Sequence, residues 1–118
     1  MNAVLIISHG SRAPQVEETF ASIVAMVRTK LPEMLVDSAC MQLSDSTVPK
    51  AVARLAANNA TTVKVVPYFL FTGMHIQSDI PQLIAELAEQ YPDISFTIGQ
   101  TLGVDERLAD ILVDRIKG

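Results

Sequence analysis

The chain of 118 residues lacks the cysteine pairs of disulfide-bonded proteins and the long apolar runs of membrane proteins. It has a single cysteine, Cys40, which excludes an internal disulfide and suits a reducing compartment. No apolar run reaches the ~18 residues needed to span a membrane, because Lys64 and Pro67 interrupt the widest run, residues 63–71. The first residues do not show the cationic start and long apolar stretch of a signal peptide. We therefore expect a cytoplasmic protein with no membrane segment.

Positive charge is also scarce and scattered. Nine Lys and Arg residues stand against 13 Asp and Glu residues, and the net charge is −4. Nucleic acid binding usually requires a concentrated basic face, so we expect no nucleic acid partner. What the chain has in abundance is apolar residues, at 49% of the sequence. This content and the length predict one globular domain, residues 1–118, with a proper core.

Strand-like apolar runs and helix-like spacings alternate along the whole chain. Strands are expected at residues 3–8, 35–43, 62–69 and 94–98. Helices are expected at residues 16–31, 48–56, 80–91 and 104–116. In the third helix, Ser78 or Asp79 is the expected N-cap and Pro81 lies near the start. Four βα units predict an α/β protein with a four-stranded parallel sheet and helices on both faces, in three α/β/α layers.

Two histidines, His9 and His75, each follow one of the expected strands. The carboxyl ends of parallel strands share one edge of the sheet, where small-molecule sites form. Neutral imidazole binds divalent transition metals and accepts a proton near neutral pH. The sequence therefore predicts that the two rings meet in one pocket, close enough to share a metal. The alternative at His9 is an ordinary turn in which the histidine hydrogen-bonds a neighbouring loop.

Small and polar residues surround both histidines and suit the binding of an anionic ligand. The glycines allow tight turns and close approach of a ligand, and the hydroxyl and guanidinium groups are donors for carboxylates or phosphates. The candidate binding residues are Ser8, Gly10, Ser11, Arg12, Thr72 and Gly73. The glycine patterns of dinucleotide loops and P-loops are missing. Phosphatases that form a phosphohistidine have an arginine directly before the histidine, where this chain has Ser8.

Two segments carry a resemblance to a known family. They are Ile7-Ser-His-Gly-Ser-Arg12 and Val66-Pro-Tyr-Phe-Leu-Phe-Thr-Gly-Met-His-Ile-Gln-Ser-Asp-Ile-Pro81. At this spacing they resemble the short, single-domain sirohydrochlorin chelatases of the CbiX/SirB family, over nearly the whole chain. The resemblance implies a chelatase-like domain that inserts a divalent metal into sirohydrochlorin in cobalamin or sirohaem biosynthesis. Cobalt is the expected metal substrate, with iron or nickel as alternatives, and no permanent cofactor is expected.

The resemblance also implies roles for particular residues and an assembly. His9 and His75 match the two active-site histidines of the family. Many relatives carry a glutamate on the second strand, where this chain has Gln42 in Met41-Gln-Leu-Ser-Asp-Ser-Thr47. An amide can neither supply a carboxylate's charge nor take up a proton, which leaves open a metal- or tetrapyrrole-binding protein without catalysis. A plain α/β domain that serves protein contacts is a further alternative.

The resemblance also implies a homodimer. The short form of the family resembles one half of the two-domain chelatases, which build their cleft from two similar halves. Two copies of this chain would complete a cavity able to hold a macrocycle, and closed two-fold pairing is the commonest soluble assembly.

Overall fold

Four strands alternate with four helices in the computed structural model, which describes residues 1–42, 44–71 and 73–118, without the side chains of residues 74–77. The strands are β1 (Asn2–Ser8), β2 (Leu35–Cys40), β3 (Thr62–Pro67) and β4 (Ser95–Ile98). The helices are α1 (Pro14–Lys30), α2 (Val48–Ala57), α3 (Met74–Gln90) and α4 (Glu106–Lys117). The predicted succession of four βα units is confirmed.

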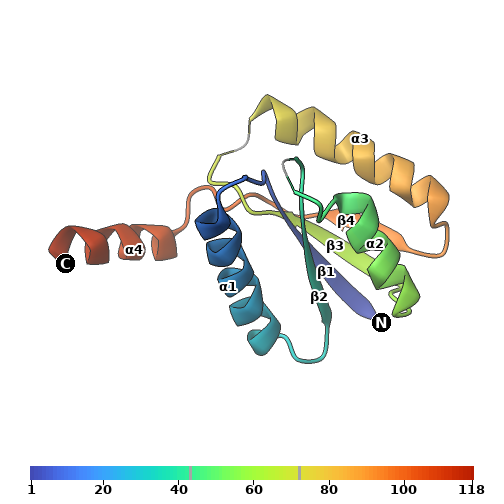
Figure 1. Ribbon diagram of the computed structural model, residues 1–118, viewed down its shortest axis with the longest axis horizontal. Helices are drawn as coiled ribbons and strands as arrows, with labels where there is room; N and C mark the ends of the chain where they lie inside the picture. Colours follow the sequence, from blue (N-terminus) through green and yellow to red (C-terminus); the bar gives the residue numbers. More distant parts are fainter. Residues whose placement is uncertain (43, 72) are drawn as a thin grey trace.

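All strands are parallel, and their order in the sheet is β2-β1-β3-β4. The chain first moves from β1 outward to β2 and then returns past β1 to β3. Because such crossovers are right-handed, this change of direction places α1 on one face of the sheet and α2 and α3 on the other (Figure 1). Sheets of this kind bind ligands outside the carboxyl ends of the strands where the order reverses, here between β1 and β3.

The central strand β1 supplies core residues to both layers. Ala3, Leu5 and Ile7 pack with residues of α2 and α3, whereas Val4 and Ile6 pack with residues of α1. Successive side chains of a strand point to opposite faces, so a strand covered by helices on both sides is apolar at every position. This explains why residues 3–7 read as one continuous apolar run.

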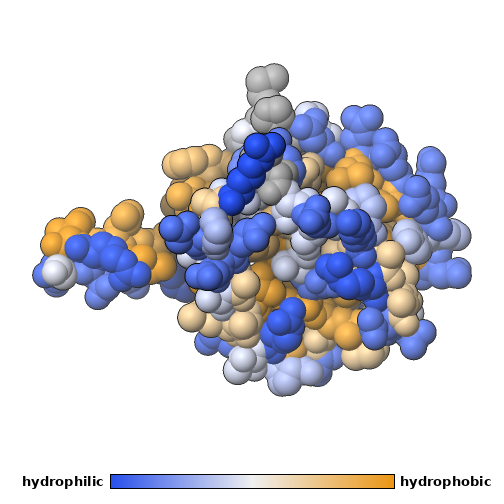
Figure 2. Space-filling model, in the orientation of Figure 1, coloured by the Kyte–Doolittle hydropathy of each residue, from blue (hydrophilic) through white to orange (hydrophobic). Residues whose placement is uncertain are grey.

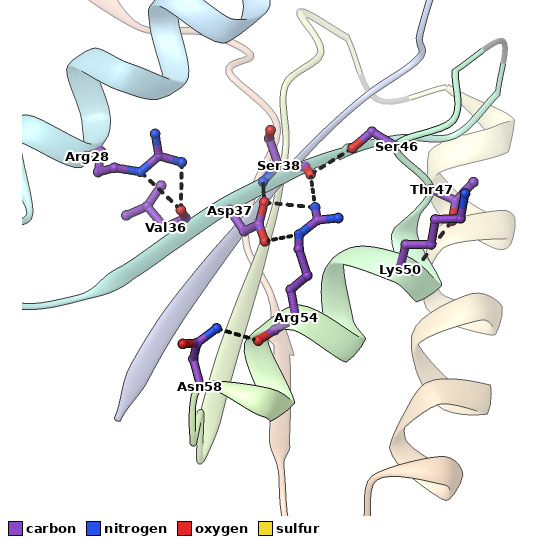
Figure 3. A network of polar contacts seen from close by, with 9 residues as sticks. All are labelled: Arg28, Val36, Asp37, Ser38, Ser46, Thr47, Lys50, Arg54 and Asn58. Carbon is purple, nitrogen blue, oxygen red and sulfur yellow. Dashed lines mark hydrogen bonds and ion pairs between the residues drawn. The ribbon is translucent and has the colours of Figure 1, made fainter.

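Side chains from two helices cover the outer edge of β2. The guanidinium of Arg28 on α1 donates to the Val36 carbonyl at 2.9 Å. Arg54 on α2 donates to the Asp37 carboxylate at 2.9 Å and to the Ser38 carbonyl at 3.4 Å (Figure 3). Since these carbonyl groups already accept hydrogen bonds, this edge of the sheet is blocked against pairing with another strand.

The third helix begins earlier than its sequence signals predict. Gly73 is the N-cap of α3, and Pro81 lies inside the helix. The predicted caps Ser78 and Asp79 are therefore wrong, because the chain is already helical before it reaches them. β2 and β3 are also shorter than predicted and end at Cys40 and Pro67.

Helix α4 does not cover either face of the sheet. Figure 1 shows it extending away from the rest of the molecule, and none of its residues is buried. The radius of gyration is 14.8 Å, compared with about 13.5 Å for a compact domain of this length. Among the helices of the described residues, none has the length and apolar character that a membrane crossing requires.

Because β1 lies in the centre of the sheet, we expect its buried side chains to contribute strongly to the free energy of unfolding. Leu5 has no exposed surface, so Leu5→Ala should lower the free energy of unfolding by about 2–5 kcal/mol. Met26→Ala, at a side chain on α1 that is 59% exposed, should change it by less than about 0.5 kcal/mol. Urea denaturation of both variants measures the difference, and equal losses would contradict this account of the core.

Candidate functional site

His9 lies where β1 ends, and hydrogen bonds from both neighbouring strands hold the backbone around it. The N–H of Tyr68 donates to the Ile7 carbonyl at 2.7 Å on the β3 side. On the β2 side, the N–H groups of Met41 and Gln42 donate to the carbonyls of Ser8 and His9 at 2.9 and 3.0 Å. His9 thus lies at the carboxyl edge of the sheet, as the sequence predicts, and the strand order places it at the reversal between β1 and β3.

Gly10 makes this arrangement possible. Its φ of +95° lies in the left-handed region that favours glycine. A Cβ at this position would overlap the carbonyl oxygen of Gln42, which comes from the neighbouring loop. The group that approaches Gly10 closely is thus the backbone of the protein itself, and the approach of a ligand there stays a prediction.

The His9 side chain is exposed and borders a pocket of about 410 Å³. Its ring meets the buried Phe69 ring edge-on, with 4.4 Å between centroids. The pocket is lined by Ser8, His9, Gly10, Gln15, Val16, Thr19, Phe20, Tyr68 and Phe69. A mainly apolar wall with a few polar groups at one side is typical of small-molecule sites, and the volume is in their usual range.

The predicted binding residues after β1 divide between two hollows. Ser8 and Gly10 line the pocket with His9, but the Ser8 hydroxyl also lies 3.4 Å from the sulfur of the buried Cys40. Ser11 and Arg12 line a separate polar hollow of about 590 Å³ together with Glu17, Ser44 and Asp45. Two carboxylates beside Arg12 weaken it as an anchor for an anionic ligand.

His75 lies in the first turn of α3, because the helix begins earlier than the caps expected at Ser78 or Asp79 would place it. Its backbone is described, but its side chain and the whole of Thr72 lie outside the described residues, so the meeting of the two imidazoles stays a prediction. Gly73 has a φ of −103°, and a side chain there would meet open space. The backbone conformation of Gly73 therefore does not require glycine, and the sharp turn expected there stays a prediction, since Thr72 lies outside the described residues.

Gln42, which the resemblance matches to a glutamate of the family, lies two residues beyond the end of β2. Its backbone N–H donates a hydrogen bond to the His9 carbonyl, and its side chain is exposed. The position is thus close to the histidine loop through the backbone. Within the described residues, no three His, Cys, Asp or Glu side chains are grouped so as to hold a metal.

Sequence reasoning missed the wall of the pocket. Val16 and Phe20 read as core positions of an amphipathic helix, and Phe20 indeed stacks on Tyr68 with 5.7 Å between centroids. Phe69 contacts His9, whereas Phe71, two residues further along the same apolar run, is 80% exposed. The available signal was the position of Val16 and Phe20 in the first two turns after the histidine loop.

Comparison with known proteins places the whole chain in one group. The sequence pattern of the CbiX family matches residues 3–118. A sirohydrochlorin cobaltochelatase of Methanococcoides burtonii is 32% identical over 95% of this chain and 92% of its own length. A sirohydrochlorin ferrochelatase of Priestia megaterium is 32% identical over 98% of this chain but 44% of its own length.

A solved structure shows the same fold. The sirohydrochlorin chelatase SirB from Bacillus subtilis subspecies spizizenii, in complex with cobalt, matches with a TM-score of 0.92 at 28% identity. The match covers 99% of this chain and 50% of that chain. This chain therefore spans about half the length of SirB and of the Priestia relative.

The backbone conformation at Gly10 predicts that a side chain there lowers the stability of the fold. Gly10→Ala should destabilise the fold by more than about 2 kcal/mol, because a left-handed φ and a backbone overlap both oppose the added methyl group. Gly73→Ala is the matched control, and it should cost at most about 1 kcal/mol, as an N-cap change in open space. Thermal unfolding measures both variants. A Gly10→Ala protein as stable as the control would mean that the loop moves freely away from Gln42.

Proposed function

The chain belongs to the CbiX family, and we propose that it inserts a divalent metal ion into sirohydrochlorin. The observation that carries the proposal is the exposed His9 ring at the mouth of an apolar pocket, at the reversal between β1 and β3. Cobalt is the proposed metal, in cobalamin biosynthesis. The support for cobalt is the match to a cobaltochelatase over nearly the full length of both chains.

The proposed reaction exchanges two protons for one metal ion. The free-base macrocycle and the divalent ion give the metallated macrocycle and two protons, while the ion loses bound water. A neutral imidazole can hold the partly dehydrated ion or accept a leaving pyrrole proton. We assign these tasks to His9 and His75 together. The edge-on contact of Phe69 limits the orientations that the His9 ring can take.

The remaining candidate residues have supporting roles in this proposal. The substrate carries many carboxylates, and its ring is apolar. We propose that Val16, Phe20 and Tyr68 contact the ring, and that hydroxyl and amide groups around Ser8, Gly10 and Thr72–Gly73 anchor carboxylates. Arg12 and Ser11 would meet only a substrate group that reaches the second hollow.

The setting of the enzyme is also part of the proposal. We propose that residues 1–118 form one chelatase-like domain that acts in the cytoplasm as a homodimer. The support for the dimer is that this chain has about half the length of SirB and of the Priestia relative, so a second copy would supply the missing half.

Gln42 favours one alternative, a protein that binds metal or tetrapyrrole without turnover. Its amide cannot take up a proton, and its backbone adjoins His9. The two functions differ in stoichiometry: an enzyme converts many equivalents of sirohydrochlorin, whereas a binding protein stops at one.

The first functional prediction concerns the histidines. The wild-type chain should metallate sirohydrochlorin beyond one equivalent, faster with Co²⁺ than with Fe²⁺ or Ni²⁺, as followed by the visible spectrum. His9→Ala and His75→Ala should each lower kcat at least about 100-fold, since a group that transfers protons contributes at least that much. Lys30→Ala, at the far end of α1, is the control. Loss of circular dichroism in the histidine variants would instead indicate a structural role, and faster iron insertion would overturn the choice of cobalt.

The second functional prediction concerns the missing carboxylate. Gln42→Glu should raise kcat by at least about tenfold, because it restores a group that can take up a proton close to His9. Gln42→Met is the control that removes the amide without adding charge, and it should stay near wild type. Unchanged kinetics in Gln42→Glu would remove this carboxylate from the proposed mechanism.

A further inference from the structure

The pocket beside His9 has an apolar wall without fixed charges. Val16, Phe20, Tyr68 and Phe69 form most of this wall, and Val16 is 49% exposed. Among the described residues that line the pocket, none is a lysine, an arginine, an aspartate or a glutamate. Apolar side chains are also exposed on the projecting helix α4 (Figure 2), but the described lining of the pocket comes from α1 and from the ends of β1 and β3. The pocket is therefore suited to an apolar part of a ligand, because a charged group would lose its hydration there without gaining a partner.

The aromatic residues of this wall hold one another in place. Phe20 on α1 stacks on Tyr68, which follows β3, with the two ring planes 21° apart. Phe69 meets the His9 ring edge-on. Phe20 and Phe69 are each only 9% exposed, so most of their surface is already packed within the protein. The wall is thus formed before a ligand arrives, and Val16 is its most exposed apolar side chain.

Charged groups lie on the other side of the first turn of α1. Val16 lines the His9 pocket, whereas the next residue, Glu17, lines the polar hollow with Arg12 and Asp45. Successive positions of a helix point about 100° apart, which explains why neighbouring residues line different hollows. In the polar hollow, the carboxylates of Glu17 and Asp45 disfavour a further carboxylate by repulsion of like charges. Neither hollow is therefore a good place for a carboxylate chain of a substrate.

The proposed substrate has little apolar surface at its periphery. In sirohydrochlorin, every carbon at the outer edge of the rings carries a chain that ends in a carboxylate. Two of the four rings are reduced, and each of these has a tetrahedral carbon that also carries a methyl group, on the ring face opposite to its carboxymethyl chain. Such a methyl-bearing edge can enter an apolar pocket while its carboxylate stays in water.

The size of the pocket also favours an edge of the macrocycle. Its volume of about 410 Å³ lies near the lower end of the range for sites that enclose a drug-sized ligand. The macrocycle with its chains is larger than such a ligand, so one ring edge enters and the other rings remain outside.

We propose that the His9 pocket binds the methyl-bearing edge of a reduced ring, and that Val16 is the residue that selects it. The methyl group lies against Val16 and the stacked pair of Phe20 and Tyr68, and the carboxymethyl chain points out of the pocket. The rest of the macrocycle then extends past the His9 ring at the mouth of the pocket. The chain thereby distinguishes a methylated, reduced tetrapyrrole from a flat porphyrin that has the same carboxylates. This inference rests on sirohydrochlorin as the ligand of the proposed function, but it does not require metal insertion.

Binding of two metal-free tetrapyrroles tests the selectivity. Uroporphyrin III carries the same carboxylate chains as sirohydrochlorin, but its rings are flat and have no methyl group. The metal-free chain should bind sirohydrochlorin at least about tenfold more tightly, because a methyl group in an apolar pocket contributes about that factor. Titration of the fluorescence of each tetrapyrrole gives the two Kd values. Equal affinities, or tighter binding of uroporphyrin III, overturn the proposal.

Val16→Thr tests whether contact with the methyl group is the cause. The substitution keeps the shape of the side chain but replaces one of its methyl groups with a hydroxyl, which an apolar contact does not tolerate equally. The Kd of sirohydrochlorin should rise at least about fivefold, while that of uroporphyrin III stays within about twofold. Met26→Thr is the matched control, because it introduces the same residue at an exposed position of α1 outside the pocket, and it should leave both Kd values within about twofold. Equal weakening of both ligands in Val16→Thr would show that Val16 does not select the methyl group.

Turnover distinguishes failure of this inference from failure of the proposed chelatase activity. In an active chain, Val16→Thr should raise KM for sirohydrochlorin by a larger factor than it lowers kcat, because the contact lies away from the reacting nitrogens and is made before the metal enters. Metal insertion into sirohydrochlorin and uroporphyrin III with equal KM would overturn the inference and leave the chelatase proposal standing. Selective binding of sirohydrochlorin without turnover would support the inference and overturn the chelatase proposal.

Discussion

The pairing of β1 with a strand on each side is the interaction on which the rest of the structure depends. The pairing continues past the ends of the strands, where the carbonyls of Ile7, Ser8 and His9 each accept a backbone hydrogen bond. His9 therefore has its place from the register of three strands, and a local loop preference could not fix it as firmly. Gly10 is the residue that lets the chain leave this pairing and turn into α1, because its φ is positive and its missing side chain admits the Gln42 carbonyl.

The alternation of strands and helices could be predicted because it depends on residue patterns within each segment. Apolar runs and helical spacing recur within each segment, and the right-handed crossover then fixes the faces. The start of α3 could not be predicted in this way. Ser78 and Pro81 are residue types typical of a helix N-terminus, but the N-cap of α3 is Gly73. The position of α4 relative to the sheet could not be predicted from the sequence either. An amphipathic pattern shows that a face must be covered, but not whether the same molecule covers it.

The sequence predicted the position of His9 in the site, but not the residues that form the wall of its pocket. His9 could be placed because strand ends share one edge, whereas the pocket wall depends on which side chains point toward it. Phe69 and Phe71 show the difference, since they lie two residues apart in one apolar run, yet Phe69 is buried against His9 and Phe71 is exposed. The same holds for Arg12, which is three residues from His9 but faces a hollow with Glu17 and Asp45.

Phe69 connects the His9 pocket with the linker that leads to α4. Its ring contacts His9, and its carbonyl accepts the hydrogen bond that anchors the α4 linker. Any packing that orders α4 therefore restrains the backbone that positions the ring beside His9. Since small displacements at a reacting centre cost large factors in rate, the order of this linker bears on the position of the ring that contacts His9.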